Sequence, residues 1–191
     1  MDIYFASANR NKIREINSLL PASFTVHGIA GLIQGDLEET GLTLEENALM
    51  KARAIFKLTG VHSFADDTGL EVHALDSAPG VFSARYAGPQ RNDADNIQKL
   101  LEELRFKSSR KAQFRTVIAY VDGKQEKLFE GVVVGTIATR PAGSMGFGYD
   151  PVFVPEGNST TFAEMTLDEK NLISHRARAF RAFADFMSQF R

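Results

Sequence analysis

Short apolar runs and helical stripes of apolar residues follow one another along this chain. Residues 3–6 form a mostly apolar run that favours a buried strand, and apolar residues then recur at helical spacing from Ile13 to Leu20, before Pro21. Residues 24–29 predict a second strand. Strands and helices in this order predict an α/β fold.

Three further helical segments are expected, each starting at a capping signal. The capping residues are Thr43 with Glu46, Asn92 with Asp93, and Thr166 with Glu169. The first of these helices ends at Gly60. In the last segment, apolar residues recur at intervals of four and three from Ile173 to Met187, which predicts one buried stripe. The pattern leaves open whether Ser174 divides this segment into two helices.

Two β-rich stretches, residues 112–121 and 128–139, flank the dipeptide Asp122-Gly123. This dipeptide is a strong hairpin signal, so the two stretches predict an antiparallel ribbon and hence a mixed sheet. The basic segment 105–111 before them is interpreted as a solvated linker.

Composition narrows the class of protein. With 191 residues, 43% hydrophobic and 24% charged, the chain is expected to form a single globular domain, residues 1–191, with two lobes. A net charge of -2 gives no overall attraction to nucleic acid or to an anionic membrane, so a polyanion site has to be a local pocket. The absence of cysteine excludes disulfides and thiolate chemistry. The N-terminus lacks the pattern of a signal peptide and no apolar run reaches membrane-spanning length, so we expect a cytoplasmic protein.

The densest polar chemistry lies in residues 65–88. Asp66 and Asp67 follow a run that is interpreted as a strand end, and Thr68 and Gly69 are expected to turn the chain. A plain turn would explain the Asp and Gly residues. Two successive carboxylates repel each other, however, and this repulsion is relieved when one of them binds a cation or acts as a base.

Two other segments suggest ligand binding. Residues 7–12, SANRNK, connect a strand to a helix, where backbone N–H groups favour phosphate, although a simply capped helix explains them as well. Residues 143–153 contain three glycines, and among these residues we expect Phe147 and Tyr149 in an exposed turn that offers a stacking face to a base. No GxxxxGK[ST] sequence is present, which excludes P-loop chemistry.

Five motifs together resemble the inosine triphosphate pyrophosphatase family, whose members act on non-standard purine nucleoside triphosphates such as dITP and XTP. They are SANRNK at 7–12, LEETGLTLEENALMKARA at 37–54, DDTG at 66–69, FGYD at 147–150 and KNLISHR at 170–176. The resemblance implies an elongated mixed sheet with flanking helices and two lobes with the active-site cleft between them. It also implies Mg²⁺-dependent hydrolysis of ITP, dITP and XTP to monophosphate and pyrophosphate by a homodimer.

The resemblance assigns roles to particular residues. It makes Asp67 the catalytic base, and Glu39 and Asp67 the metal ligands. The implied substrate-binding residues are Ser7, Ala8, Asn9, Arg10, Asn11, Lys12, Lys51, Thr68, Phe147, Gly148, Tyr149, Asp150, Lys170, His175 and Arg176. Asn47 is expected to support the site.

Two alternatives stay open at this point. A non-catalytic nucleotide- or RNA-binding module would use the same basic and aromatic residues, but acidic turns repel phosphate unless a metal intervenes. A pyrophosphatase of modified pyrimidine nucleotides would keep the chemistry and change the substrate. We expect small-molecule nucleotides as partners, and neither nucleic acid nor a membrane.

Overall fold

The computed structural model describes residues 2–17, 24–33 and 37–190. The strands are β1 (Asp2–Phe5), β2 (Thr25–Gly28), β3 (Ser63–Val72), β4 (Pro79–Gly80), β5 (Lys111–Val121), β6 (Glu126–Ile137) and β7 (Phe153–Pro155). The α-helices are α1 (Arg10–Asn17), α2 (Leu44–Thr59), α3 (Asp93–Glu103), α4 (Leu167–Ile173) and α5 (His175–Met187). None of the helices within these described ranges is long and apolar enough to cross a membrane.

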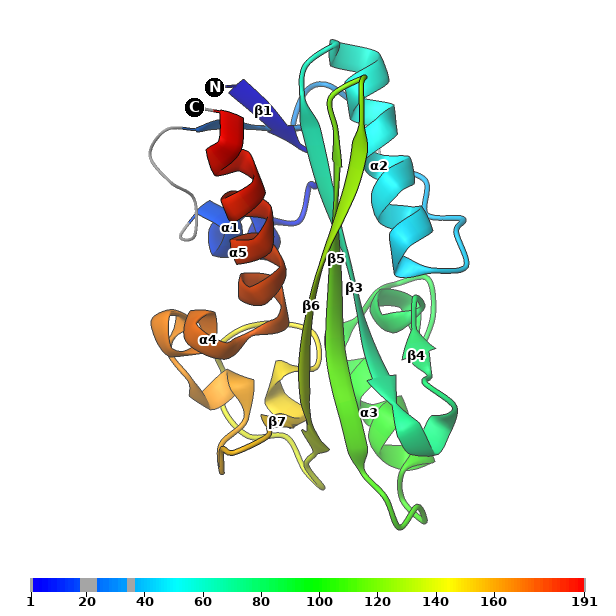
Figure 1. Cartoon of the computed structure of the whole chain (residues 1–191). Coiled ribbons are helices and arrows are strands. Elements are labelled where there is room, and N and C mark those ends of the chain that lie inside the picture. Colours follow the sequence, from blue (N-terminus) through cyan, green and yellow to red (C-terminus); the bar gives the residue numbers. More distant parts are fainter. Residues whose placement is uncertain (1, 18–23, 34–36, 191) are drawn as a thin grey trace. The chain divides into compact units, whose positions relative to one another are not determined.

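The strands form one mixed sheet in the order β2-β1-β3-β5-β6-β7, with β4 paired to β3 (Figure 1). β1 runs parallel to both β2 and β3, whereas β4 is antiparallel to β3 and β7 is antiparallel to β6. At the β5–β6 hairpin, Asp122 Oδ1 accepts hydrogen bonds from the backbone N–H groups of Lys124 and Gln125, both at 2.8 Å. The mixed α/β sheet and its hairpin are therefore confirmed.

The chain divides into two compact units, in agreement with the two expected lobes. Unit 1 comprises residues 1–67, 116–131 and 176–191, and unit 2 comprises residues 68–115 and 132–175. The strands β3, β5 and β6 each contribute residues to both units.

Each unit has an aromatic-rich core. In unit 1, Phe64 of β3 stacks on Phe5 of β1 with ring centroids 4.8 Å apart, and it contacts Phe183 of α5 at 5.0 Å. In unit 2, Phe114 of β5 packs against Phe153 of β7 at 4.7 Å. These rings are buried, so α5 and β7 are held by the apolar surface that they remove from water.

The predicted helix caps are confirmed. Thr43 Oγ1 accepts from the N–H of Glu46 at 3.1 Å, and Gly60 ends α2 with a left-handed φ of 68°. Ser174 has an extended backbone, with ψ of 153°, and it separates α4 from α5. The last segment therefore forms two helices. The part of the first predicted helix from residue 18 onward lies outside the described residues.

The expected turn at Thr68 and Gly69 is wrong, because β3 continues through it to Val72. Leu70 pairs with Gly80 of β4 across the sheet. This pairing brings the carbonyl oxygen of Gly80 so close that a Cβ atom on Gly69 would lie 2.7 Å from it. Gly69 thus serves the close approach of two strands rather than a reversal of the chain.

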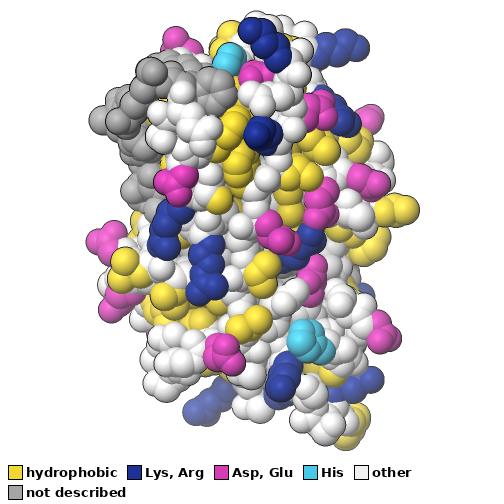
Figure 2. All heavy atoms as spheres, viewed as in Figure 1, with side chains coloured by type: hydrophobic (Ala, Val, Ile, Leu, Met, Phe, Trp, Pro, Cys, Tyr) yellow, Lys and Arg dark blue, Asp and Glu magenta, His cyan; other side chains and the backbone are white. Residues whose placement is uncertain are grey.

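The interpretation of residues 105–111 as a solvated linker is wrong for Arg110. Its guanidinium donates to the carbonyl oxygens of Leu104, Ile137 and Ala138, at 3.2, 2.6 and 2.7 Å. The Arg110 side chain therefore links the end of α3 to the end of β6 by hydrogen bonds within unit 2. Elsewhere on the surface, basic and acidic side chains are interspersed over the face shown in Figure 2.

Candidate functional site

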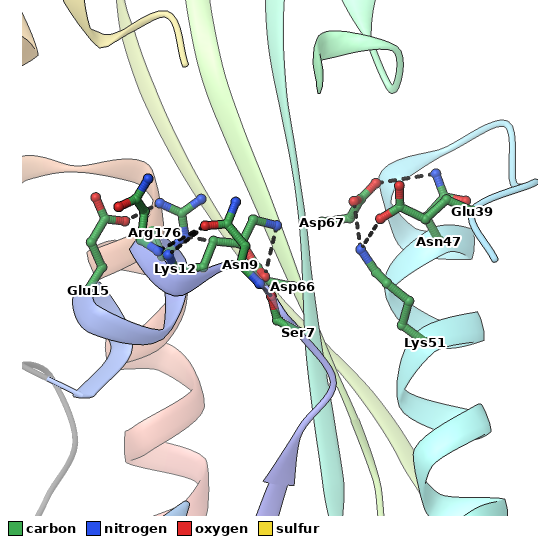
Figure 3. Close-up of polar contacts among 11 residues, drawn as sticks. Ser7, Asn9, Lys12, Glu15, Glu39, Asn47, Lys51, Asp66, Asp67 and Arg176 are labelled. Atoms are coloured by element: carbon green, nitrogen blue, oxygen red, sulfur yellow. Dashed lines mark hydrogen bonds and ion pairs between the residues drawn. The ribbon is translucent and has the colours of Figure 1, made fainter. Parts of the chain in front are cut away.

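The two adjacent carboxylates belong to different clusters of side chains in unit 1. Asp66 and Asp67 are consecutive residues of β3, and consecutive side chains of a strand point to opposite faces of the sheet. Figure 3 shows Asp66 directed toward Lys12 and Arg176, and Asp67 directed toward Lys51 and Asn47. The separation relieves the repulsion that the sequence suggested.

Asp66 is surrounded by basic side chains. Its Oδ1 accepts from Lys12 Nζ at 3.0 Å, and its Oδ2 accepts from Arg176 Nε at 3.2 Å. Arg176 also donates through Nη1 to Glu15, which lies on α1 together with Lys12. Asp66, Glu15 and Arg176 are buried, so this cluster is a desolvated network of ion pairs.

The charges around Asp66 keep it ionised. Burial acts to raise the pKa of Asp66, but the nearby Lys12, Arg176 and Lys51 outweigh burial and hold that pKa well below its usual range. Burial lowers the pKa of Lys12, with Asp66 acting in the opposite direction. A carboxylate stabilised in this way is a poor proton acceptor.

Asp67 lies in the second cluster, where two carboxylates share one ammonium group. Lys51 Nζ donates to Asp67 Oδ1 at 2.9 Å and to Glu39 Oε1 at 2.7 Å. Asn47, one turn before Lys51 on α2, donates through Nδ2 to Asp67 Oδ2 at 3.3 Å. Asn47 Oδ1 in turn accepts from the N–H of Gly41 at 2.8 Å, which fixes the segment that follows Glu39.

At Asp67 the net effect of burial and nearby charges on the pKa is opposite to that at Asp66. Burial raises the pKa of Asp67, and the opposing effects of Lys51 and Lys12 do not cancel it. The pKa of Lys51 is raised, because Asp67 and Glu39 together outweigh its own burial. Of the two carboxylates, Asp67 is therefore the better proton acceptor.

The segment before α1 forms a capped helix start. Asn9 Oδ1 accepts from the backbone N–H groups of Asn11 and Lys12 at 2.9 and 3.3 Å, and Ser7 Oγ accepts from the N–H of Asn9 at 3.2 Å. The residues from Ala8 to Asn11 are exposed. Their predicted role in phosphate binding stays a prediction, as do the roles of the other expected substrate-binding residues.

Unit 2 holds the predicted aromatic segment and one of the predicted lysines. Phe147 is half-buried, and its ring centroid lies 5.2 Å from Lys170 Nζ. Asp150, itself buried, accepts from Lys170 Nζ at 2.7 Å and from the N–H of Phe147 at 2.9 Å. Thr68, at the start of this unit, is half-buried.

The expectation that both aromatic residues are exposed is wrong for Tyr149. Only 4% of Tyr149 is exposed, and its ring belongs to the apolar core of unit 2. Its hydroxyl donates to the carbonyl oxygen of Ser83 at 2.9 Å, which satisfies its one polar group inside the core. Phe147 is thus the better placed of the two rings for stacking on a ligand.

The adjacent residues His175 and Arg176 fall in different units. His175 belongs to unit 2, where its buried ring stacks on Phe114 with centroids 4.5 Å apart. Arg176 belongs to unit 1 and is bound to Glu15 and Asp66. Sequence reasoning did not single out Glu15, although its position three residues after Lys12 on one helix was an available signal.

In this mixed α/β sheet, one strand carries two carboxylates, and each carboxylate contacts a lysine from a helix. This arrangement is suited to acid–base hydrolysis. A model of the Ham1 family matches residues 3–186 of this chain. A protein of Flavobacterium psychrophilum named dITP/XTP pyrophosphatase is 50% identical over 187 residues, which are 97% of this chain and 98% of the relative.

Two solved structures agree with this match over nearly complete chains. The Ham1 protein of Staphylococcus aureus is 41% identical with a TM-score of 0.91, and the alignment covers 100% of both chains. A HAM1 protein of Coxiella burnetii is 42% identical with a TM-score of 0.92, and the alignment covers 99% of both. The chain belongs to the Ham1 family, which confirms the resemblance seen in its motifs.

Proposed function

We propose that this protein hydrolyses dITP, ITP and XTP between the α and β phosphates, releasing the nucleoside monophosphate and pyrophosphate. The observation that carries the proposal is the Asp67 cluster, in which a buried carboxylate of raised pKa lies beside a lysine and a second carboxylate. Membership of the Ham1 family and the names of relatives, such as the dITP/XTP pyrophosphatase of Flavobacterium psychrophilum, supply the substrate class. The activity would remove non-standard purine nucleotides from the cellular pool.

In this reaction Asp67 accepts the proton of the attacking water. As the water oxygen bonds to the α phosphorus, the bond from that phosphorus to the bridging oxygen breaks and pyrophosphate leaves with the bonding electrons. Asn47 and Lys51 orient the Asp67 carboxylate through its two oxygens. The raised pKa of Asp67 brings its basicity closer to neutral pH, where a general base is most effective.

The same cluster fits a divalent cation. Glu39 Oε1 and Asp67 Oδ1 converge on one cationic atom, Lys51 Nζ, at 2.7 and 2.9 Å. Mg²⁺ is commonly bound by one or two carboxylates together with substrate phosphates, so this oxygen pair is a suitable donor set. We assign Glu39 and Asp67 to Mg²⁺, which when bound neutralises phosphate charge and polarises the phosphoryl group.

The remaining residues form two sets, one assigned to the phosphates of the substrate and one assigned to its purine base. Lys12 and Lys51 of unit 1 are assigned to the triphosphate, with residues 7–11 providing polar contacts. Lys170, which lies beside the Phe147 ring in unit 2, is assigned to the base end together with Phe147 and His175. Arg176, which is held in position by Glu15 and Asp66, is assigned to recognition of the base.

We further propose that the protein acts as a homodimer in the cytoplasm on small-molecule nucleotides, without a nucleic-acid or membrane partner. The net charge of -2 supports the last point, because no overall electrostatic attraction to a polyanion is available.

Identifying the products tests the proposed bond cleavage and metal dependence. With ITP and Mg²⁺, we expect IMP and pyrophosphate in equal amounts, measured by ion-exchange chromatography, and loss of turnover with excess EDTA that added Mg²⁺ restores. The metal is required in this scheme because two carboxylates otherwise repel the triphosphate. Release of IDP and orthophosphate would contradict the proposed cleavage, and full activity after chelation would contradict the metal assignment.

A further inference from the structure

The direction in which the Phe147 side chain leaves the chain is set by its backbone. Phe147 lies in the segment 143–150 of unit 2, which we term the 143–150 loop. A peptide group is planar, so the φ and ψ of Phe147 are determined by the orientations of the two peptide planes on either side of its Cα atom. Fixing both planes therefore fixes the direction in which the side chain leaves the backbone.

A carboxylate holds each of these two planes. The N–H of Phe147, which belongs to the preceding plane, donates to Asp150 Oδ2 at 2.9 Å. The N–H of Gly148, which belongs to the following plane, donates to Asp93 Oδ2 at 2.7 Å. Asp150 lies within the loop and is fixed by Lys170, whereas Asp93 is supplied by α3.

The peptide plane between Phe147 and Gly148 would rotate easily without the hydrogen bond to Asp93. Gly148 has a φ of 62°, in the left-handed region, and a Cβ atom built there would meet no atom within 4 Å. Glycine moves between backbone conformations more readily than any other residue. Loss of the Asp93 contact would thus free ψ of Phe147 and φ of Gly148 together.

Asp93 itself stands on a rigid element. It is the first residue of α3, whose N-terminus is capped by the Asn92 side chain accepting from the N–H of Asp95 at 3.0 Å. Ile97 and Leu100 of the same helix are buried in the core of unit 2. A carboxylate on such an element can hold a loop more precisely than another loop residue could.

We infer that Asp93 is a positioning residue that fixes the direction in which the Phe147 side chain leaves the backbone, and thereby sets how tightly the purine base is held. The base-stacking role of Phe147 rests on the function proposed above. The Asp93–Gly148 contact is exposed, and a hydrogen bond to a charged group contributes modestly, so an effect of about 3- to 10-fold on binding is expected.

Amide hydrogen exchange of the ligand-free protein tests the positioning directly. In Asp93→Ala, exchange at the Gly148 amide, measured by NMR, should be about 3- to 10-fold faster than in the unmutated protein. Asp95→Ala is the matched control, because Asp95 is also an exposed acid in the first turn of α3 and its removal changes the helix dipole similarly. Equal exchange rates at Gly148 in the two variants would overturn the inference, whatever the protein's substrate.

Kinetics test the consequence for the base. Asp93→Ala should raise KM for ITP about 3- to 10-fold with kcat within about twofold, and Asp93→Asn should recover part of the loss because its amide oxygen still accepts a hydrogen bond. In a Phe147→Ala background, Asp93→Ala should raise KM no further. An additive effect there, or an unchanged KM despite faster exchange, would overturn the route through Phe147. An unmutated protein that does not hydrolyse ITP would instead reject the proposed function.

Discussion

Asp67→Asn is expected to lower kcat by about 10²–10⁴-fold while the protein stays folded. The amide has nearly the same shape as the carboxylate, but it cannot accept the proton of the attacking water. Lys51 keeps Glu39 as an ion-pair partner at 2.7 Å, so the substitution does not leave a buried ammonium unpaired. Steady-state hydrolysis of ITP by the purified variant, together with its thermal unfolding, measures both parts of this prediction.

Glu38→Gln provides the matched control for the loss of one negative charge. Glu38 is exposed and lies next to Glu39 in the sequence, and it has no part in the proposed chemistry. Its substitution should change kcat by less than about twofold, since exposed charges at this distance are screened by solvent. A near-normal kcat for Asp67→Asn would contradict the role of Asp67 as the general base and would leave it a structural role in β3.

Asp66→Asn is expected to lower the free energy of unfolding by about 3–5 kcal/mol, although Asp66 is not the proposed base. The substitution leaves Lys12 without the carboxylate that it contacts at 3.0 Å and removes one of the two acidic partners of Arg176. The Asp66 side chain is fully buried, so solvent cannot replace these interactions. Urea unfolding at pH 7 measures the difference.

The pH dependence of this difference follows from the depressed pKa of Asp66. Because the pKa is lower in the folded protein than in the unfolded chain, the contribution of Asp66 is fully present above the unfolded value of about 4. It is lost progressively as the pH falls through the folded value. The destabilisation caused by Asp66→Asn should therefore be larger at pH 7 than at pH 3. A difference below about 1 kcal/mol at pH 7, or one that does not change with pH, would contradict the role of the charge.

Local signals in the sequence predicted most of the secondary structure. The capping box of Thr43, the helix end at Gly60 and the hairpin at Asp122-Gly123 depend on residues only a few positions apart, and the structure confirms them. The continuation of β3 through Gly69 was missed, because it depends on pairing with β4 and on lysines that neutralise the aspartates. Such contacts between distant segments leave no local pattern.

The site was predictable in its residue types and less so in its arrangement. The sequence indicated Glu39, Lys51 and Asp67, and the structure brings their side chains together. The placement of Asp66 and Asp67 on opposite faces of the sheet was not predictable, because the sequence pattern places the end of β3 before them. The burial of Tyr149 was hidden for a similar reason, since its hydroxyl is satisfied by the distant carbonyl group of Ser83.

The ratio of kcat/KM for ITP to that for ATP tests the proposed function most directly. Inosine and xanthosine present a hydrogen-bond acceptor at position 6 of the purine, whereas adenosine presents an amino donor there. A site whose donors face that position leaves buried groups unpaired with adenine, and such a mismatch can reduce kcat/KM by up to about 10⁴-fold. With saturating Mg²⁺ and the unmutated protein, we predict that ITP, dITP and XTP are hydrolysed far more efficiently than ATP. Comparable values of kcat/KM for ATP and ITP would contradict the proposal.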